Sequence, residues 1–153
     1  MGRPPVRVEE ALVGVTKLGV DTAPLIYLVE RNPAFVDAAR EVLRRINDGA
    51  PRGVSSVVTL TEVLIVPKRA GRADLETACR DLLLNNDNFT LLPLDVAVAE
   101  RAADLRARYN LKTPDALQVA TALENGCQAF LTNDAGLRRV AEIRTLVLGE
   151  LTA

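Results

Sequence analysis

Short, mostly apolar segments alternate along the chain with longer segments in which hydrophobic residues recur at helical spacing. The apolar segments, which include one or two polar residues each, cover residues 15–20, 89–94, 127–132 and 145–148, and the short segment Gly-Val-Ser-Ser at 53–56 also reads as a strand. A short apolar run bounded by turn residues is typical of a strand buried on both faces. Helical spacing or capping residues mark the segments 24–31, 34–47, 57–67, 74–84, 95–109, 113–125 and 136–140. We expect Thr113 to cap its helix, Pro114 to be the first helical residue, and Pro67 to kink or end the helix that contains it.

This alternation of buried strands with helices predicts an α/β fold with a mostly parallel sheet covered by helices on both faces. At 153 residues the chain is long enough for one domain with a substantial core. Residues 1–14 contain two prolines and mixed charges, and we expect them to form an N-terminal extension or a loosely attached first segment. The predicted domain therefore covers residues 15–153.

The composition narrows the class of protein. It is ordinary for a soluble globular domain, with 48% hydrophobic and 25% charged residues. No apolar stretch approaches the ~18 residues of a transmembrane helix, and residues 1–20 do not read as a secretory signal. Cys79 and Cys127 show no paired spacing, which favours reduced core thiols. We expect a cytoplasmic protein with no membrane partner.

Two features of the charged residues bear on function. The chain has no histidine, which excludes histidine-based triads, general bases and metal ligands. The net charge of −1 gives no overall attraction to nucleic acid, but 16 of the 19 basic residues are arginine, whose fork matches phosphate. Two interpretations remain open, a local basic rim or ordinary solvated helix faces. The residues concerned are Arg101, Arg106, Arg108, Lys112, Arg138 and Arg139.

Four carboxylates stand at the edges of apolar segments. Asp21 follows the first predicted strand, and Glu62 lies in the helix after the second. Asp115 is in the first turn of the helix 113–125, and Asp134 follows the fourth strand. The carboxyl edge of an open α/β sheet is where ligands bind. If the fold brings the four acids together, they form a single acidic pocket.

Such a pocket requires a counter-ion. Two unit charges about 4 Å apart repel by roughly 4 kcal/mol at an effective dielectric constant of 20. A hard divalent cation, Mg²⁺ or Mn²⁺, binds carboxylate and water oxygens, whereas zinc is disfavoured without histidine or paired cysteine. Each acid also has a purely structural alternative: Asp21 and Asp134 as helix caps, and Asp115 as a first-turn acid. The spacing alone does not decide between these roles.

The sequence resembles PIN-domain proteins, and within them the VapC-like toxins of bacterial and archaeal toxin–antitoxin pairs. The resemblance rests on Val-Asp-Thr at 20–22, Thr-Glu-Val-Leu at 61–64, Leu-Lys-Thr-Pro-Asp-Ala at 111–116 and Leu-Thr-Asn-Asp at 131–134. It covers residues 15–148. It implies a Rossmann-like parallel sheet of about five strands in the order 3-2-1-4-5, with Asp21 and Asp134 as neighbours.

By this resemblance, Asp21, Glu62, Asp115 and Asp134 match the family's acidic tetrad, which binds the metal and carries the catalysis. Thr132 and Asn133 match the polar pair that accompanies it. Two departures stand out. Ala23 occupies a position where many relatives have Asn or Ser, and the segment before the first strand is longer than usual.

The resemblance implies a Mg²⁺- or Mn²⁺-dependent endoribonuclease, the toxin component of a VapBC-type system. The metal would supply a nucleophilic water, and Glu62 would orient or deprotonate it. The expected substrate is single-stranded or loop RNA. The expected partners are a cognate antitoxin and a second copy of the chain, with the helices in 25–35 and 58–65 as candidate contacts.

Other functions remain as alternatives. The same fold serves nucleases that process RNA or cut DNA outside toxin–antitoxin pairs, and a PIN fold could be a non-catalytic binding protein. A haloacid-dehalogenase-like phosphatase would need a second aspartate at position 23, which is Ala23. A receiver-type module would need a late lysine after a strand, but the last lysine, Lys112, precedes a helix.

Overall fold

The computed structural model describes residues 3–153, and its centre is a five-stranded parallel sheet in the order β4-β3-β2-β5-β6. The strands are β2 (Lys17–Val20), β3 (Arg52–Ser56), β4 (Phe89–Leu92), β5 (Ala129–Thr132) and β6 (Arg144–Val147). Numbered from β2, this order is 3-2-1-4-5, as the resemblance implied. The central strands β2 and β5 pair with Val20 opposite Leu131, so their carboxyl ends lie side by side.

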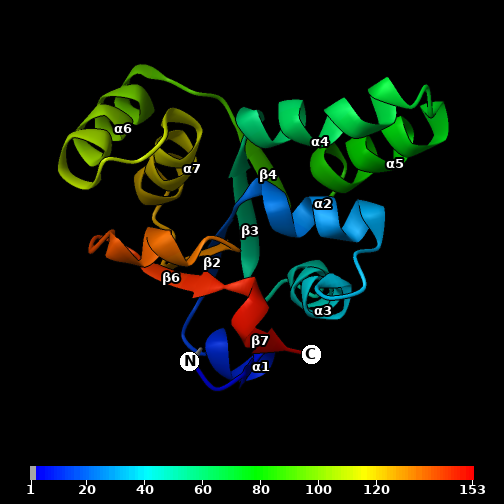
Figure 1. Ribbon diagram of the computed structural model, residues 1–153, viewed down its shortest axis with the longest axis horizontal. Coiled ribbons are helices and arrows are strands. Elements are labelled where there is room, and N and C mark those ends of the chain that lie inside the picture. The colour runs from blue at the N-terminus through cyan, green and yellow to red at the C-terminus, as the bar shows by residue number, and fades with distance from the viewer. Residues whose placement is uncertain (1–2) are drawn as a thin grey trace.

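Helices cover both faces of this sheet, as predicted (Figure 1). On one side lie α6 (Val96–Tyr109) and α7 (Thr113–Glu124). On the other side lie α2 (Thr22–Glu30), α3 (Val36–Asn47), α4 (Val57–Arg69) and α5 (Ala73–Leu84). Two short 3₁₀ turns, η1 (Ala135–Arg139) and η2 (Leu148–Glu150), flank β6. Within residues 3–153, no helix has the length and apolarity needed to cross a bilayer.

The sheet separates two hydrophobic cores. Successive residues of β5 alternate between them: Ala129 and Leu131 face the core under α2 and α3, and Phe130 faces the core under α6 and α7. Since both faces are buried, three successive residues of the strand are apolar, and only Thr132 at its carboxyl end is polar.

Gly19 in β2 brings α7 unusually close to the sheet. A Cβ at this position would lie 2.6 Å from the Cβ of Ala122 and 3.0 Å from the Phe130 ring. Any larger residue would push α7 outward. The glycine therefore sets the distance between the sheet and the helix that carries Asp115.

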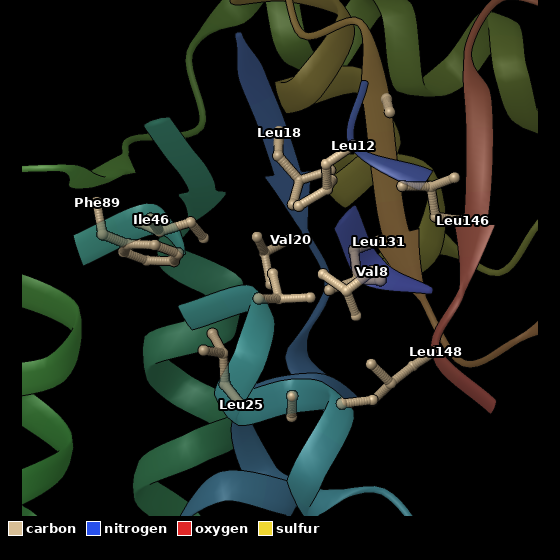
Figure 2. Close-up of a cluster of buried hydrophobic side chains, with 14 of the residues drawn as sticks. Val8, Leu12, Leu18, Val20, Leu25, Ile46, Phe89, Leu131, Leu146 and Leu148 are labelled. Atoms are coloured by element: carbon tan, nitrogen blue, oxygen red, sulfur yellow. The ribbon is translucent and has the colours of Figure 1, made fainter. Parts of the chain in front are cut away.

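The N-terminal segment is part of the main core, so the prediction of a loosely attached segment is wrong for residues 6–12. β1 (Val6–Arg7) pairs in parallel with β7 (Leu151–Thr152), and α1 (Val8–Ala11) follows directly. Figure 2 shows Val8 and Leu12 packed among the side chains of the sheet and of α2. The helical spacing of these apolar residues outweighs the two prolines before them. Residues 1–2 of the predicted extension lie outside the described residues.

Two details of the helix ends also differ from expectation. α4 continues through Pro67 to Arg69, because a proline in the last turn removes only one backbone hydrogen bond. α7 begins at Thr113 with Lys112 as its cap residue, and the Thr113 hydroxyl instead accepts a hydrogen bond from Arg106 at 3.0 Å.

The expectation for the cysteines is confirmed: Cys79 and Cys127 are free and buried.

The packing of the N-terminal segment can be tested with two valines that lie five residues apart. Val8 is 0% exposed and Val13 is 72% exposed. We expect Val8→Ala to lower the free energy of unfolding by about 2 kcal/mol, because it leaves a cavity in the core. Val13→Ala should change it by less than about 0.5 kcal/mol. Urea denaturation measures both, and equal effects would contradict the observed packing.

Candidate functional site

Asp21 lies at the centre of the candidate site, between the end of β2 and the start of α2. Its Oδ1 accepts a hydrogen bond from the backbone N–H of Thr22 at 2.9 Å, so Asp21 caps α2. Its Oδ2 accepts one from the Thr132 hydroxyl at 2.8 Å. The half-buried carboxyl group is thus fixed by two different elements of the chain.

Asp134 is linked to Asp21 by the same threonine, Thr132. The backbone N–H of Asp134 donates to Thr132 Oγ1 at 3.1 Å, and Asp134 Oδ1 accepts from the N–H of Gly136 at 2.9 Å. The structural roles expected for both aspartates, as caps of α2 and η1, are therefore confirmed. Capping uses one or two carboxylate oxygens and leaves the charge at the edge of the sheet.

Glu62 and Asp115 approach this edge from the helices. Glu62, in α4, accepts a hydrogen bond from the Thr22 hydroxyl at 2.9 Å. Asp115 lies in the first turn of α7 and is half-buried. Burial raises the pKa of Asp115, and the negative charges of Asp134 and Glu62 raise it further.

The pKa of Asp21 is raised by the same two effects, burial and neighbouring negative charge. Burial raises the pKa of Asp21 from 3.8 to about 6, and the charges of Asp115 and Glu62 add to the rise. The hydrogen bonds from Thr132 and Thr22 act in the opposite direction. The charge of Glu62 therefore acts on both Asp21 and Asp115, and Asp115 is also coupled to Asp21 and to Asp134.

The chemistry of these donors suits a hard cation, but their present positions do not complete a metal site. Within residues 3–153 no group of three or more carboxylate, thiol or imidazole side chains could hold a metal ion as arranged. Oxygens of Asp21, Glu62 and Asp134 are turned toward protein donors instead. Binding an ion would require small shifts of these side chains, which can keep their present hydrogen bonds because an ionised carboxylate accepts at more than two sites.

The other member of the predicted polar pair, Asn133, points away from the acids. Its Nδ2 donates to the Tyr27 hydroxyl at 3.1 Å, and its Oδ1 accepts from the N–H of Gly149 at 2.9 Å. These bonds join β5 to α2 and to the C-terminal segment. The structure therefore brings Thr132 into the acidic group and gives Asn133 contacts that stabilise its surroundings.

Most residues of the predicted basic rim form ion pairs or hydrogen bonds with nearby residues. Arg101, Arg108 and Arg138 form ion pairs with Glu124, with Asp104 and Glu142, and with Glu150, respectively. Arg106 and Arg139 donate to backbone oxygens. Lys112 and Arg139 are the basic residues whose charges lower the pKa of Asp115, so they are the ones that lie near the acids.

Sequence reasoning missed a buried polar cluster beneath the acids. Its members come from α2, β3, α4 and α7, and all are at most 6% exposed. They are Thr22, Ser55, Ser56, Thr59 and Gln118. The available signal was a polar residue in an otherwise apolar stretch of helix, as Gln118 is between Leu117 and Val119.

The raised pKa of Asp21 predicts a pH-dependent effect of Asp21→Asn. Below about pH 4 the wild-type group is protonated in the folded state, so burial carries no charge penalty. Above about pH 6 it is ionised, and the penalty reaches roughly 2–3 kcal/mol. In EDTA, Asp21→Asn should therefore raise the free energy of unfolding near about pH 7.5, and most of this gain should vanish near about pH 4.

Urea denaturation at the two pH values measures this difference. Asp37→Asn, at an exposed position in the first turn of α3, serves as the control and should show no such dependence. A gain for Asp21→Asn that is equal at both pH values would show that the carboxyl group is not desolvated.

Solved structures with the same fold are numerous, and several of them are toxin–antitoxin proteins. A toxin–antitoxin complex from Klebsiella pneumoniae matches with a TM-score of 0.66 and 24% identity, over 86% of this chain and 97% of that chain. VapBC2 from Rickettsia felis, bound to a DNA fragment from its promoter, matches with a TM-score of 0.68 and 12% identity, over 86% and 98%.

A third similar structure is the Mycobacterium tuberculosis toxin VapC20, described as cleaving the Sarcin-Ricin loop. It matches with a TM-score of 0.65 and 18% identity, over 84% of this chain and 98% of that chain. At these identities the likeness establishes the fold. No curated protein matches the chain.

Residues 19–143 match the family model of the PIN domain, and this range includes all four acids and Thr132. The match covers well over half of the chain. The chain therefore belongs to the PIN-domain family.

Proposed function

We propose that this PIN domain is a metal-dependent endoribonuclease and the toxin component of a VapBC-type toxin–antitoxin pair. The observation that carries the proposal is that Asp21 and Asp115 are both partly buried at the carboxyl edge of β2 and β5, where the negative charges of neighbouring acids repel them. A fold gains no stability from gathering like charges in this way. Such an arrangement is typical of a site that binds a cation or performs chemistry.

Asp21, Asp115, Asp134 and Glu62 would hold Mg²⁺ or Mn²⁺, which in the bound state supplies a nucleophilic water and neutralises the phosphate. Asp21 is held in place by Thr132 and by the N-terminus of α2. Glu62, which accepts a hydrogen bond from the Thr22 hydroxyl, would orient the attacking water or accept its proton. Lys112 and Arg139, beside Asp115, add positive charge for the phosphodiester.

The proposed substrate is RNA. With three phenylalanines, two tyrosines and no tryptophan, the chain offers few platforms on which bases can stack. Recognition would therefore depend on phosphates and on RNA shape, in single-stranded or loop regions that reach the site. The description of the similar VapC20 as a Sarcin-Ricin loop cleaving toxin supports a structured RNA loop.

The proposal includes a cognate antitoxin, a homodimer and a cytoplasmic location, where such a toxin meets its RNA. The similar structures from Klebsiella pneumoniae and Rickettsia felis are toxin–antitoxin assemblies. On this chain, Val57, Ile65 and Val66 leave apolar surface exposed on α4. This surface lies on the helix that carries Glu62, so a protein bound there would lie beside the acidic site.

The test of this function is cleavage of structured RNAs with and without metal. We expect wild-type protein to cut RNA in Mg²⁺ or Mn²⁺ and to be inactive in EDTA. Asp115→Asn should lower the cleavage rate by about 100-fold or more, because it removes a carboxylate from the proposed metal site. Gel analysis of end-labelled RNA measures the rate.

Asp37→Asn is the matched control, since it makes the same chemical change at an exposed position on α3. It should retain the wild-type rate. Single-stranded DNA, tested in parallel, distinguishes a ribonuclease from a DNA-cleaving member of the fold. Undiminished cleavage by Asp115→Asn would contradict the assignment of the site, and the absence of cleavage by folded wild-type protein in either metal would contradict the proposed activity.

A further inference from the structure

The buried polar cluster beneath the acids forms one continuous hydrogen-bonded network, which we call the hydroxyl–amide network (Thr22, Ser55, Ser56, Thr59 and Gln118). Gln118 lies at its centre and is 3% exposed. Buried polar groups destabilise a core unless their hydrogen bonds are made, and every member of this network has a partner. Such a network fixes the positions of its members relative to one another.

The orientation of the Gln118 amide follows from its neighbours. The Ser56 hydroxyl accepts from the N–H of Val58 at 3.2 Å and donates its own proton to Gln118 Oε1 at 2.8 Å. The two hydrogens on Gln118 Nε2 then point to Thr59 Oγ1 at 2.6 Å and to Thr22 Oγ1 at 3.1 Å. Gln118 thus acts as a donor toward both threonines.

The direction of the remaining bonds can be deduced because each hydroxyl has a single proton. Ser55 gives its proton to the carbonyl oxygen of Val20 at 2.7 Å. The 2.7 Å contact between Ser55 and Thr59 must therefore use the proton of Thr59. The proton of Thr22 is the only one left for Glu62 Oε1, 2.9 Å away.

The opposite orientation of the amide would fail in two places. If Gln118 accepted from both threonines, the protons of Thr22 and Thr59 would be used on it. The short contact between Ser55 and Thr59 and the one between Thr22 and Glu62 would then lack a proton. The bonds therefore run in one direction, with Thr22 donating to Glu62.

We infer that Gln118 is a positioning residue, which acts through Thr22 to hold the Glu62 carboxylate in place for the proposed cleavage of RNA. This inference rests on the proposed function. Thr22 has two acceptors within reach, Glu62 at 2.9 Å and Thr59 at 3.1 Å. The Gln118 amide already donates to Thr59, which leaves Glu62 as the favoured acceptor for the Thr22 proton.

Replacing Gln118 with methionine keeps the length of the side chain and removes both donors. Thr22 is then free to turn its proton toward Thr59, and Glu62 loses its fixed partner. We expect Gln118→Met to lower kcat for RNA cleavage by about 10- to 100-fold with little change in KM, because RNA binding does not depend on this bond. Thr121→Val is the matched control. Thr121 is also buried on α7, but its hydroxyl donates only to Leu117 O within the helix.

A structural role and a positioning role are separated by combining substitutions. Thr22→Val removes the hydroxyl that links Gln118 to Glu62, whereas Thr22→Ser retains it. If Gln118 acts through Thr22, Thr22→Val should lower kcat as Gln118→Met does, and the double variant should show no further loss. Thr22→Ser should stay near the wild-type kcat. If the two losses of kcat multiply in the double variant, the two residues act independently and the inference is wrong.

Two further measurements do not depend on activity. The chain has two glutamines, Gln118 and Gln128, so selective ¹⁵N labelling gives two side-chain amide signals, assigned with Gln128→Met. We expect the buried Gln118 amide to exchange with solvent at least about 100-fold more slowly than that of the exposed Gln128, and faster in Thr22→Val. Crystal structures of Gln118→Met and Thr121→Val should show Glu62 moved away from Thr22 only in the first.

Together, the kinetic and crystallographic measurements distinguish the failure of the inference from the failure of the proposed function. If wild-type protein cleaves RNA and Gln118→Met retains kcat, the function stands and the inference is wrong. If no RNA is cleaved, the proposed function fails, and the crystal structures still decide the positioning. A Glu62 that keeps its bond to Thr22 in Gln118→Met would overturn the inference in either case.

Discussion

The Thr132 hydroxyl joins the two strand ends on which the acidic site depends. It donates to Asp21 and accepts from the backbone N–H of Asp134, so one oxygen atom links the carboxyl ends of β2 and β5. This is possible only because the two strands pair in parallel, with Val20 opposite Leu131. The order of strands thus determines the chemistry: a sheet in which β2 and β5 were not neighbours would separate the two aspartates.

The structure reduces the repulsion between the acids without removing it. Helix capping by Asp21 and the hydrogen bond from Thr132 stabilise the ionised form of Asp21, yet burial outweighs them and the pKa of Asp21 rises to about 6. Asp115 has no such cap, and its pKa is also raised. The remaining cost is what a bound cation would offset, which is why the proposed metal and the observed electrostatics support each other.

The fold could be predicted from the sequence because most of its strands are short and mainly apolar, and its helices begin and end at clear turn residues. The edge position of Asp21 and Asp134 followed from the same pattern. The pairing of residues 6–7 with the C-terminus could not be predicted, since a two-residue strand has no periodicity. Likewise, Asn133 bonds to Tyr27 and Gly149, contacts that depend on tertiary structure alone. The hydroxyl–amide network was hidden because small polar residues also occur in ordinary turns.

One face of α7 connects the acidic site, the hydroxyl–amide network and the close contact at Gly19. Asp115, Gln118 and Ala122 are three and four residues apart, so they lie on the same face of the helix. Ala122 packs against Gly19 of β2, and Asp115 reaches the acidic edge of the sheet. Between them, Gln118 donates hydrogen bonds to Thr22 and Thr59. The same face therefore sets the distance of the helix from the sheet, organises the buried polar groups and presents a carboxylate. A shift of α7 along β2 would alter all three at once, which explains why a close contact at Gly19 matters for residues at the far end of the helix.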